Sequence, residues 1–296
     1  MLYQKQVKSV LNKHKKRDSW FLDDYSVNPY EGCSCNCLYC YTRGSKYGEN
    51  MDEKLAVKAN ALEVLDRQLA ARAKKSQYGF VAVGSATDAY IHHEEQQEMT
   101  KGMLLLLLKH RFPVFISTKC TLITRDIELL KEIDTAAILP EDLKETLARG
   151  LILSVSISSL DEKVSHMLEP GAAPPLQRLE LVKRLKKEGF FTGVNAIPLL
   201  PYISDTKEEL EKIITAAKEY GADYILTGGL TLFGTGIADS KTLFYKFLER
   251  YDSSLLPKYQ QLYGSNFYTS FSYQNQLKEK AERLCKKYTI RNRILV

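Results

Sequence analysis

Residues 25–40 read YSVNPYEGCSCNCLYC, and this stretch joins the start of a predicted sheet to an unusual group of cysteines. Residues 25–29 predict a first strand, and Cys33, Cys37 and Cys40 follow it with the spacing Cys-x3-Cys-x2-Cys. Three thiolates on one tight loop can hold three irons of a cubane cluster and leave the fourth iron without a protein ligand. Because an open iron can bind and reduce a small molecule, we interpret the loop as a reactive centre.

The cysteine pattern favours this metal site over disulfides or structural zinc. Four of the six cysteines lie within eight residues, and such short loops cannot all satisfy disulfide geometry. Tetrahedral zinc sites usually take their ligands from two separated knuckles. The sequence has no second Cys or His pair at knuckle spacing, so zinc is the minor alternative.

Past residue 50, strand-like apolar runs alternate with helical patterns. Strands are expected at residues 80–84, 113–117, 151–156, 190–197 and 223–227. Helices are expected at residues 52–75, 94–109, 125–133, 175–188 and 206–220. For the last helix, Asp205 is the expected N-cap and Glu208 its capping-box partner.

Strands that alternate with helices imply a parallel sheet. Counting the strand at residues 25–29, the pattern holds six βα units, so the predicted fold is α/β, an incomplete (β/α)6 TIM-type barrel with an aromatic-rich C-terminal extension. Active sites of parallel sheets lie at the carboxyl ends of the strands, and the cysteine loop is expected there. The expected organisation is a basic N-terminal arm at residues 1–22, the partial barrel at 23–230, and a helical or irregular cap at 231–296 on the same unit.

The composition describes a mildly basic globular protein. The formal net charge is +6, which suggests a polyanionic partner only weakly, and a lysine-rich surface explains it as well. The concentrated basic patch is at residues 13–17. No apolar stretch is long enough for a secretion signal or a membrane span. We therefore expect a cytoplasmic monomer without a membrane partner.

Residues 25–43 resemble the cluster loop of radical S-adenosylmethionine (SAM) enzymes, and more closely that of the spore photoproduct lyase-like branch, often labelled DNA repair photolyase. The cysteine spacing, with Tyr39 just before Cys40, is the most specific part of the resemblance. Weaker patches follow in the expected order at residues 84–90, 117–119, 124–126 and 168–171, with Arg178. Together they cover roughly residues 8–230.

This resemblance implies a 4Fe–4S cluster and SAM as cofactors. Cys33, Cys37 and Cys40 would ligate three irons, and the amino and carboxylate groups of SAM would chelate the fourth. One electron would then cleave the sulfonium, and the resulting 5′-deoxyadenosyl radical would abstract hydrogen from the substrate. A small electron donor such as flavodoxin or ferredoxin would supply the reducing equivalents.

The resemblance also implies four residues that bind SAM near the strand ends. Tyr39 would approach the adenine through its backbone, and Thr87 would bind the methionyl part. Lys119 would pair with the cofactor carboxylate, a role that suits a flexible ammonium, and Ser156 would hydrogen-bond the ribose or sulfonium region. For Thr87 and Ser156 the alternative is a hydroxyl that caps a following helix.

The chain departs from the family pattern at three cysteine-related positions. Spore photoproduct lyases place a hydrogen-donating cysteine in the stretch that matches residues 85–88, where this chain has Ser85. A serine O–H bond is too strong to donate hydrogen to a carbon radical, which disfavours repair of spore photoproduct by that route. Cys120 is a candidate catalytic substitute if it points into the barrel, and a small buried thiol is the alternative. Cys35 stands where relatives often carry histidine, and could replace a ligand or face solvent.

Other polar residues near the expected mouth have simpler interpretations. Glu169 and Arg178 bracket a turn and are expected to form a structural pair. Asp88 and Tyr90 are candidates for lining the substrate cavity.

The sequence thus predicts a lyase-like radical SAM enzyme that abstracts hydrogen from an unidentified substrate. Nucleic acid (DNA or RNA), peptide and small molecule are the candidate substrates, and the basic charge with the family resemblance favours nucleic acid. The alternative is a non-catalytic, metal-stabilised nucleic-acid-binding protein. The ring of polar residues Thr87, Lys119 and Ser156 at the strand ends opposes this alternative, because a scaffold has no need of it.

Overall fold

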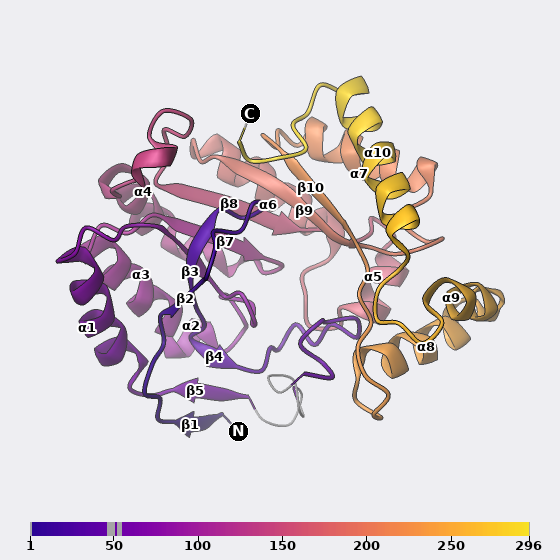
Figure 1. Cartoon of the computed structure of the whole chain (residues 1–296), viewed down its shortest axis with the longest axis horizontal. Coiled ribbons are helices and arrows are strands. Elements are labelled where there is room, and N and C mark those ends of the chain that lie inside the picture. The colour runs from indigo at the N-terminus through magenta and orange to yellow at the C-terminus, as the bar shows by residue number, and fades with distance from the viewer. Residues whose placement is uncertain (1, 46–50, 52–54, 296) are drawn as a thin grey trace.

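The computed structural model describes residues 2–45, 51 and 55–295, and its centre is a seven-stranded sheet (Figure 1). Six parallel strands follow one another in the order β3, β6, β7, β8, β9 and β10, and β2 pairs antiparallel with β3 at one edge. The strands are β2 (Asn12–Lys13), β3 (Asp23–Val27), β6 (Phe80–Val83), β7 (Val114–Thr118), β8 (Leu151–Ser156), β9 (Thr192–Leu199) and β10 (Ile225–Gly229). Within these residues the edge strands β2 and β10 do not pair with each other, so the predicted incomplete six-unit α/β barrel is confirmed.

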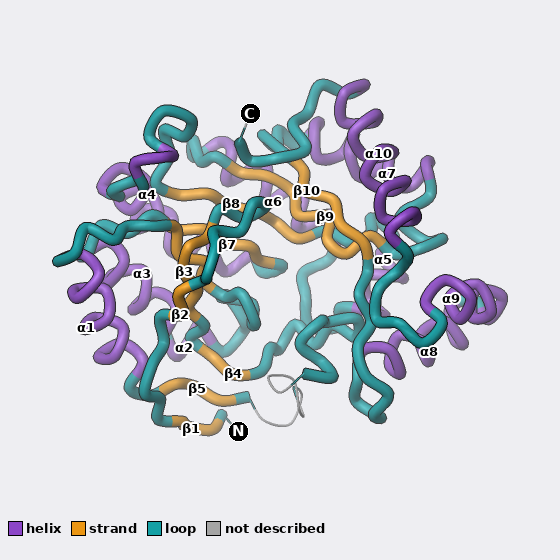
Figure 2. Tube along the Cα trace, viewed as in Figure 1, coloured by secondary structure: helices purple, strands orange, loops and turns teal. Residues whose placement is uncertain are grey.

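Helices cover the outer side of the sheet (Figure 2). They are α1 (Ala61–Ala73), α2 (Glu94–Gln97), α3 (Met99–Lys109), α4 (Ile127–Ala136), α5 (Glu162–Leu168), α6 (Pro175–Lys187) and α7 (Lys207–Glu219), with 3-10 turns at Thr121–Asp126 and Glu141–Leu143. Neighbouring helices pack side by side, as α1 does with α3, α3 with α4, and α6 with α7. In the described part of the chain, no helix combines the length and apolar character needed to cross a membrane.

The concave side of the sheet has an apolar floor and a polar upper end. Alternate residues of a strand point to opposite faces. Towards the amino ends of the strands, the inward residues belong to a separate apolar cluster that includes Phe80, Phe115, Ile152 and Tyr224. Towards the carboxyl ends, the same face carries Ser117, Ser156 and Asn195. This change of polarity along single strands places a polar chamber above a packed floor.

The expected helix at residues 52–75 is wrong at residues 56–58. Residues 52–54 lie outside the described residues, β5 (Ala56–Lys58) is a strand, and α1 begins only at Ala61. β5 lies between β1 (Tyr3–Lys5) and β4 (Tyr30–Glu31) in a second, three-stranded sheet. Tertiary pairing with segments that are distant in sequence therefore overrides the local helical pattern.

The expected helix at residues 94–109 is broken into α2 and α3. Glu98 adopts a left-handed conformation with φ of +48° between them. The buried carboxylate of Glu94 accepts hydrogen bonds from the backbone N–H groups of Thr100 (2.8 Å) and Lys101 (3.2 Å). Because the carboxylate of Glu94 satisfies backbone N–H groups at the start of α3 that have no partner within the helix, the break is stabilised.

The expected N-cap of the helix at residues 206–220 is displaced by one residue. The side chain of Thr206, not Asp205, accepts the hydrogen bond from the backbone N–H of Glu209. Asp205 instead accepts from the backbone N–H of Tyr202 and from the hydroxyl of Tyr273 in the C-terminal helix. The carboxylate expected to cap the helix is thus used in a tertiary contact with Tyr273.

The C-terminal segment contributes three further helices, α8 (Ser240–Tyr251), α9 (Leu256–Tyr263) and α10 (Phe271–Lys287), with a 3-10 turn at Ser253–Leu255. α10 packs against β10 and α7 and buries Leu277, Ala281, Leu284 and Cys285. Figure 1 shows it running beside α7 at the open edge of the sheet. The division of the chain at residues 22 and 230 stays a prediction.

We predict that Gly193 in β9 is required by the packing of the floor. A Cβ atom at this position would overlap the ring of Tyr224, whose hydroxyl donates a hydrogen bond to the carbonyl of Leu153 (2.8 Å). We expect Gly193→Ala to lower the free energy of unfolding by about 1–3 kcal/mol. At Gly229, in β10, a Cβ atom would lie 3.9 Å from its nearest neighbour, in Leu277, and Gly229→Ala should stay within about 0.5 kcal/mol of wild type. Urea unfolding of the metal-free proteins measures both, and equal effects would contradict the prediction.

Candidate active site

A cavity of about 750 Å³ lies at the carboxyl ends of the sheet strands. Three parts of the chain line it: the cysteine loop, the strand ends and the N-terminal segment around residues 14–23. Its walls include Cys33, Cys37 and Cys40. The predicted position of the cysteine loop at this end of the sheet is therefore confirmed.

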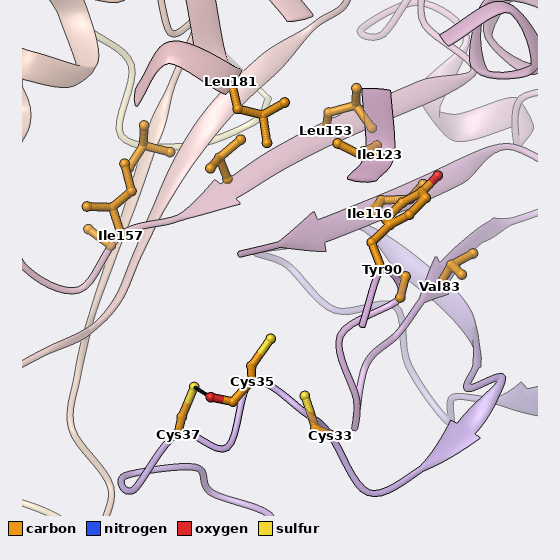
Figure 3. Packing of buried hydrophobic residues seen from close by; sticks show 14 of the residues in the cluster. Cys33, Cys35, Cys37, Val83, Tyr90, Ile116, Ile123, Leu153, Ile157 and Leu181 are labelled. Atoms are coloured by element: carbon orange, nitrogen blue, oxygen red, sulfur yellow. Dashed lines mark hydrogen bonds between the residues drawn. The ribbon is translucent and has the colours of Figure 1, made fainter. Parts of the chain in front are cut away.

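The cysteine loop follows β4 and turns back on itself without regular secondary structure. Figure 3 shows the side chains of Cys33, Cys35 and Cys37 projecting from the loop towards the strand ends. Turn hydrogen bonds join the backbone N–H of Asn36 to the carbonyl of Cys33 and that of Cys40 to the carbonyl of Cys37, each at 3.2 Å. These tight turns gather the three spaced thiols on one side of the loop.

The buried side chain of Arg43 and the segment at residues 168–171 hold this loop from outside. Nε of Arg43 donates to the carbonyl of Cys37 at 3.0 Å. The backbone N–H of Gly171 donates to the carbonyl of Cys35 at 3.1 Å. A Cβ atom at Gly171 would overlap the carbonyl oxygen of Ser34, so glycine permits this close approach of two backbones.

Asp88 connects the cysteine loop to the end of β7. Its backbone N–H lies 3.3 Å from Sγ of Cys33 as a hydrogen-bond donor. Its carboxylate accepts from the hydroxyl of Thr118 and from the backbone N–H of Lys119, both at 2.7 Å. Asp88 lines the cavity as predicted, whereas Tyr90 is 1% exposed and packs in the hydrophobic core.

The predicted strand-end residues Thr87, Lys119 and Ser156 all line the same cavity. The hydroxyl of Thr87 donates to the carbonyl of Gly32 at 2.6 Å, so it supports the start of the cysteine loop and does not cap a helix. The hydroxyls of Ser156 and Ser117 are 3.0 Å apart. The roles of these residues toward a cofactor stay predictions.

Sequence reasoning missed Asn195 and Ser117, which complete this polar ring. The side-chain amide of Asn195 donates to the hydroxyl of Ser117 at 3.2 Å. Its Oδ1 is buried and has no hydrogen-bond partner within the described residues. A buried acceptor without a partner is costly, and Asn195 lines the cavity, so this oxygen is available to a group that donates a hydrogen bond. The available signal was a polar residue in an otherwise apolar buried strand.

A buried ionic network supports Tyr39. The phenol of Tyr39 donates to the carboxylate of Glu169 and lies 2.9 Å from the hydroxyl of Ser158. Arg178 also donates to Glu169 and reaches the carbonyl of Ser156 at 2.8 Å. The expected structural pair of Glu169 and Arg178 is therefore confirmed, and it fixes the end of β8 relative to the cysteine loop.

Charges within this network keep it ionised despite its burial. Burial alone would raise the pKa of Glu169, but the charges of Arg178 and Lys119 hold that pKa below its ordinary value. Burial opposes the charge of Lys119, yet Tyr39, Cys37 and Glu169 raise the pKa of its ammonium group. The chamber thus presents a fixed positive charge beside the thiols.

The side chain of Cys35 contacts both Cys33 and Cys120. The sulfur atoms of Cys35 and Cys120 are 3.6 Å apart, and Cys35 does not face solvent, because only 1% of it is exposed. Cys120 is half-buried. Among the described residues that line the cavity, Cys120 is not included, and its catalytic role stays a prediction.

The arrangement fits the expected three-ligand cluster. Three thiols from one loop line one cavity, which the ammonium group of Lys119 also lines, and the chamber holds an acceptor without a partner among the described residues. Burial raises the pKa of the Cys37 and Cys40 thiols in the metal-free protein, so metal binding would have to displace their protons. Soft thiolate ligands suit iron–sulfur chemistry, and polar groups beside them suit an amino-acid cofactor.

Comparisons with known proteins identify the family of this chain. A family model described as the Radical SAM superfamily matches residues 27–217. An uncharacterized protein of Mycobacterium tuberculosis is 30% identical over 273 residues, which cover 90% of this chain and 75% of that protein. The Radical SAM Nalpha-GlyT isomerase of Pseudomonas phage M6 is 19% identical over 70% of this chain and 39% of its own length.

Solved structures of spore photoproduct lyase share the fold. The lyase complexed with dinucleoside spore photoproduct has a TM-score of 0.66 and 15% identity, covering 96% of this chain and 79% of that one. A variant with bound AdoMet and the same dinucleoside has a TM-score of 0.63 and 15% identity, covering 94% and 78%. Because the family match spans most of the barrel and the expected thiols meet in its mouth, this chain belongs to the radical SAM superfamily, whose cofactors are a 4Fe–4S cluster and S-adenosylmethionine.

Proposed function

We propose that this enzyme cleaves SAM reductively and uses the product radical to remove hydrogen from a substrate held in the 750 Å³ cavity. When bound, the cluster and SAM together supply a 5′-deoxyadenosyl radical for that abstraction. The observation that carries the proposal is that Cys33, Cys37 and Cys40 line the same chamber as the polar strand-end residues.

In this proposal the three thiols hold the cluster and the chamber residues hold SAM. Lys119 offers its ammonium group to the cofactor carboxylate, and its backbone is fixed by Asp88 (2.7 Å). Ser156 and the free Oδ1 of Asn195 offer hydrogen-bond partners to the ribose hydroxyls or the amino group. These groups are already positioned by protein contacts, which lowers the entropic cost of binding.

Tyr39 and Thr87 contribute chiefly through their backbones. The phenol of Tyr39 is committed to Glu169 and Ser158, which leaves the main chain of the loop to approach the adenine. The hydroxyl proton of Thr87 is committed to Gly32, so the methionyl part would meet the backbone at this strand end. Both side chains then act by fixing the loop on which the ligands stand.

The rim of the cavity supports nucleic acid as the substrate class. Lys16 and Arg17 line it together with Phe21 and the exposed Tyr41. Arg17 is held by Asp24 (3.0 Å) and by Asp142, whereas Lys16 is exposed at the rim. Basic groups beside aromatic rings are the features that bind phosphates and stack bases.

A lyase-like reaction on such a substrate would differ in its last step from that of spore photoproduct lyase. Ser85 lines the cavity at the position of the family's donor cysteine, and its hydroxyl accepts from the amide of Asn28 at 3.0 Å. A hydroxyl cannot return hydrogen to a carbon radical, so the enzyme would need Cys120 or the substrate itself for that step. Membership of the radical SAM superfamily opposes the alternative of a non-catalytic metal-stabilised nucleic-acid-binding protein.

We predict that replacing any of the three proposed ligands reduces the iron content of the protein, whereas replacing Cys35 does not. Anaerobic reconstitution should give about four irons per chain in wild type. Cys33→Ser, Cys37→Ser and Cys40→Ser should each lose most of this iron, because each removes one ligand. Cys35→Ser and the matched control Cys285→Ser should retain it. Iron and sulfide analysis measures the content, and loss in Cys35→Ser equal to that in Cys37→Ser would contradict the assignment.

We predict that the reconstituted enzyme with dithionite converts SAM to 5′-deoxyadenosine and methionine. Lys119→Met keeps the length of the side chain but removes its charge, and should raise the KM for SAM about tenfold or more, as expected for a lost charge-assisted hydrogen bond. Lys187→Met, at the opposite end of the sheet on α6, is the control. Chromatography of the products gives both values. Absence of 5′-deoxyadenosine from fully loaded wild type would reject the proposed function.

We predict that Lys16 contributes to nucleic-acid binding. Lys16→Glu should weaken binding of a fluorescent DNA oligonucleotide and lower the slope of log Kd against log salt by about one, as expected for one lost phosphate contact. Lys187→Glu makes the same charge change on α6, away from the cavity, and should leave the slope unchanged. Fluorescence anisotropy at several salt concentrations measures both. Equal slopes for the two variants would remove the argument for a nucleic-acid substrate at this rim.

A further inference from the structure

Cys35 and Cys120 are far apart in sequence but their sulfur atoms touch. Sγ of Cys35 lies 3.6 Å from Sγ of Cys120, and neither cysteine forms a disulfide. Cys35 stands between the proposed ligands Cys33 and Cys37 in the chain, whereas Cys120 follows the end of β7. The contact therefore links the iron-binding loop to the strand end that carries Lys119.

The backbones on both sides of this contact are fixed. The carbonyl of Cys35 accepts from the backbone N–H of Gly171 at 3.1 Å. The backbone N–H of Cys120 donates to the hydroxyl of Thr118 at 3.0 Å, and Thr118 in turn donates to Asp88. Because the two chain segments are held in place, the thiols face each other, and a disulfide requires their sulfur atoms to approach from 3.6 Å to about 2 Å.

We propose that Cys35 and Cys120 are an oxidisable thiol pair, which a low-molecular-weight disulfide such as oxidised glutathione converts to an intramolecular disulfide. The sulfur of Cys120 attacks the small disulfide, forms a mixed disulfide and releases one thiol. The sulfur of Cys35 then attacks Cys120, forms the Cys35–Cys120 bond and releases the second thiol. One small disulfide is reduced to two thiols, and two protein thiols lose their hydrogens.

Accessibility sets this order of attack. Cys120 is half-buried, whereas Cys35 is 1% exposed and is reached only through its neighbour. The thiols of Cys33, Cys37 and Cys40 are occupied when the cluster is bound, which leaves Cys120 as the partner in contact with Cys35. The disulfide would tie the cysteine loop to the end of β7, and it would withdraw Cys120 from any hydrogen transfer.

The test exposes the cluster-loaded enzyme to oxidised glutathione without oxygen, quenches it in acid, alkylates the free thiols and maps the linkages by peptide mass spectrometry. We expect the loss of two of the six thiols, a peptide that links Cys35 to Cys120, and full recovery of the thiols after dithiothreitol. Cys120→Ser should form no linkage at Cys35, and Cys285→Ser should behave as wild type.

A second protein keeps the test independent of the proposed function. In a variant with Cys33, Cys37 and Cys40 all replaced by alanine, no cluster can bind, and the same Cys35–Cys120 linkage is expected with the loss of two of the three remaining thiols. The proposal is overturned if neither protein gives this linkage, or if glutathione stays on Cys120 while Cys35 remains reduced. A failure to cleave SAM would reject the proposed function but would leave this result unaffected.

Discussion

The buried ion pair of Glu169 and Arg178 is the interaction on which the site depends. The cysteine loop has no regular secondary structure to hold it, so its position must come from tertiary contacts. Glu169 accepts a hydrogen bond from the phenol of Tyr39 in that loop, and Arg178 donates one to the carbonyl of Ser156 at the end of β8. Burying two charges costs several kcal/mol each, and this cost is offset only when their mutual attraction is joined by further hydrogen bonds. Two of the bonds that offset this cost, from Tyr39 to Glu169 and from Arg178 to Ser156, also join the cysteine loop to the end of β8.

Asp88 provides the second attachment in the same way. Its carboxylate gathers Thr118 and the backbone of Lys119, while its backbone N–H points to Cys33. The two attachments lie on different strands, so the loop is held from two directions across the mouth of the sheet. A metal centre held on a loop needs such outer contacts, because they orient the ligands before the metal arrives.

The chamber itself results from a change of polarity along single strands. On β8, Ile152 packs into the apolar floor, whereas Ser156 on the same face lines the cavity. The ring of Tyr224 passes over Gly193 to close the floor, so the cavity begins above it. The barrel is thus packed with apolar side chains at one end and contains the cavity at the other, and the thiols and polar strand-end residues line that cavity.

The amino-acid sequence by itself determined the sheet, the six βα units and the three thiols, because apolar periodicity and cysteine spacing are local properties that survive without knowledge of contacts. It also placed Thr87, Lys119 and Ser156 at strand ends, since strand ends can be read from the same periodicity. It failed at residues 56–58, at Glu98 and at Asp205, where partners distant in sequence decided the local structure. Only the tertiary structure brought Cys35 to Cys120 and left Oδ1 of Asn195 without a partner in the chamber. Such facts depend on which side chains meet across the fold, and that is fixed by packing and not by spacing along the chain.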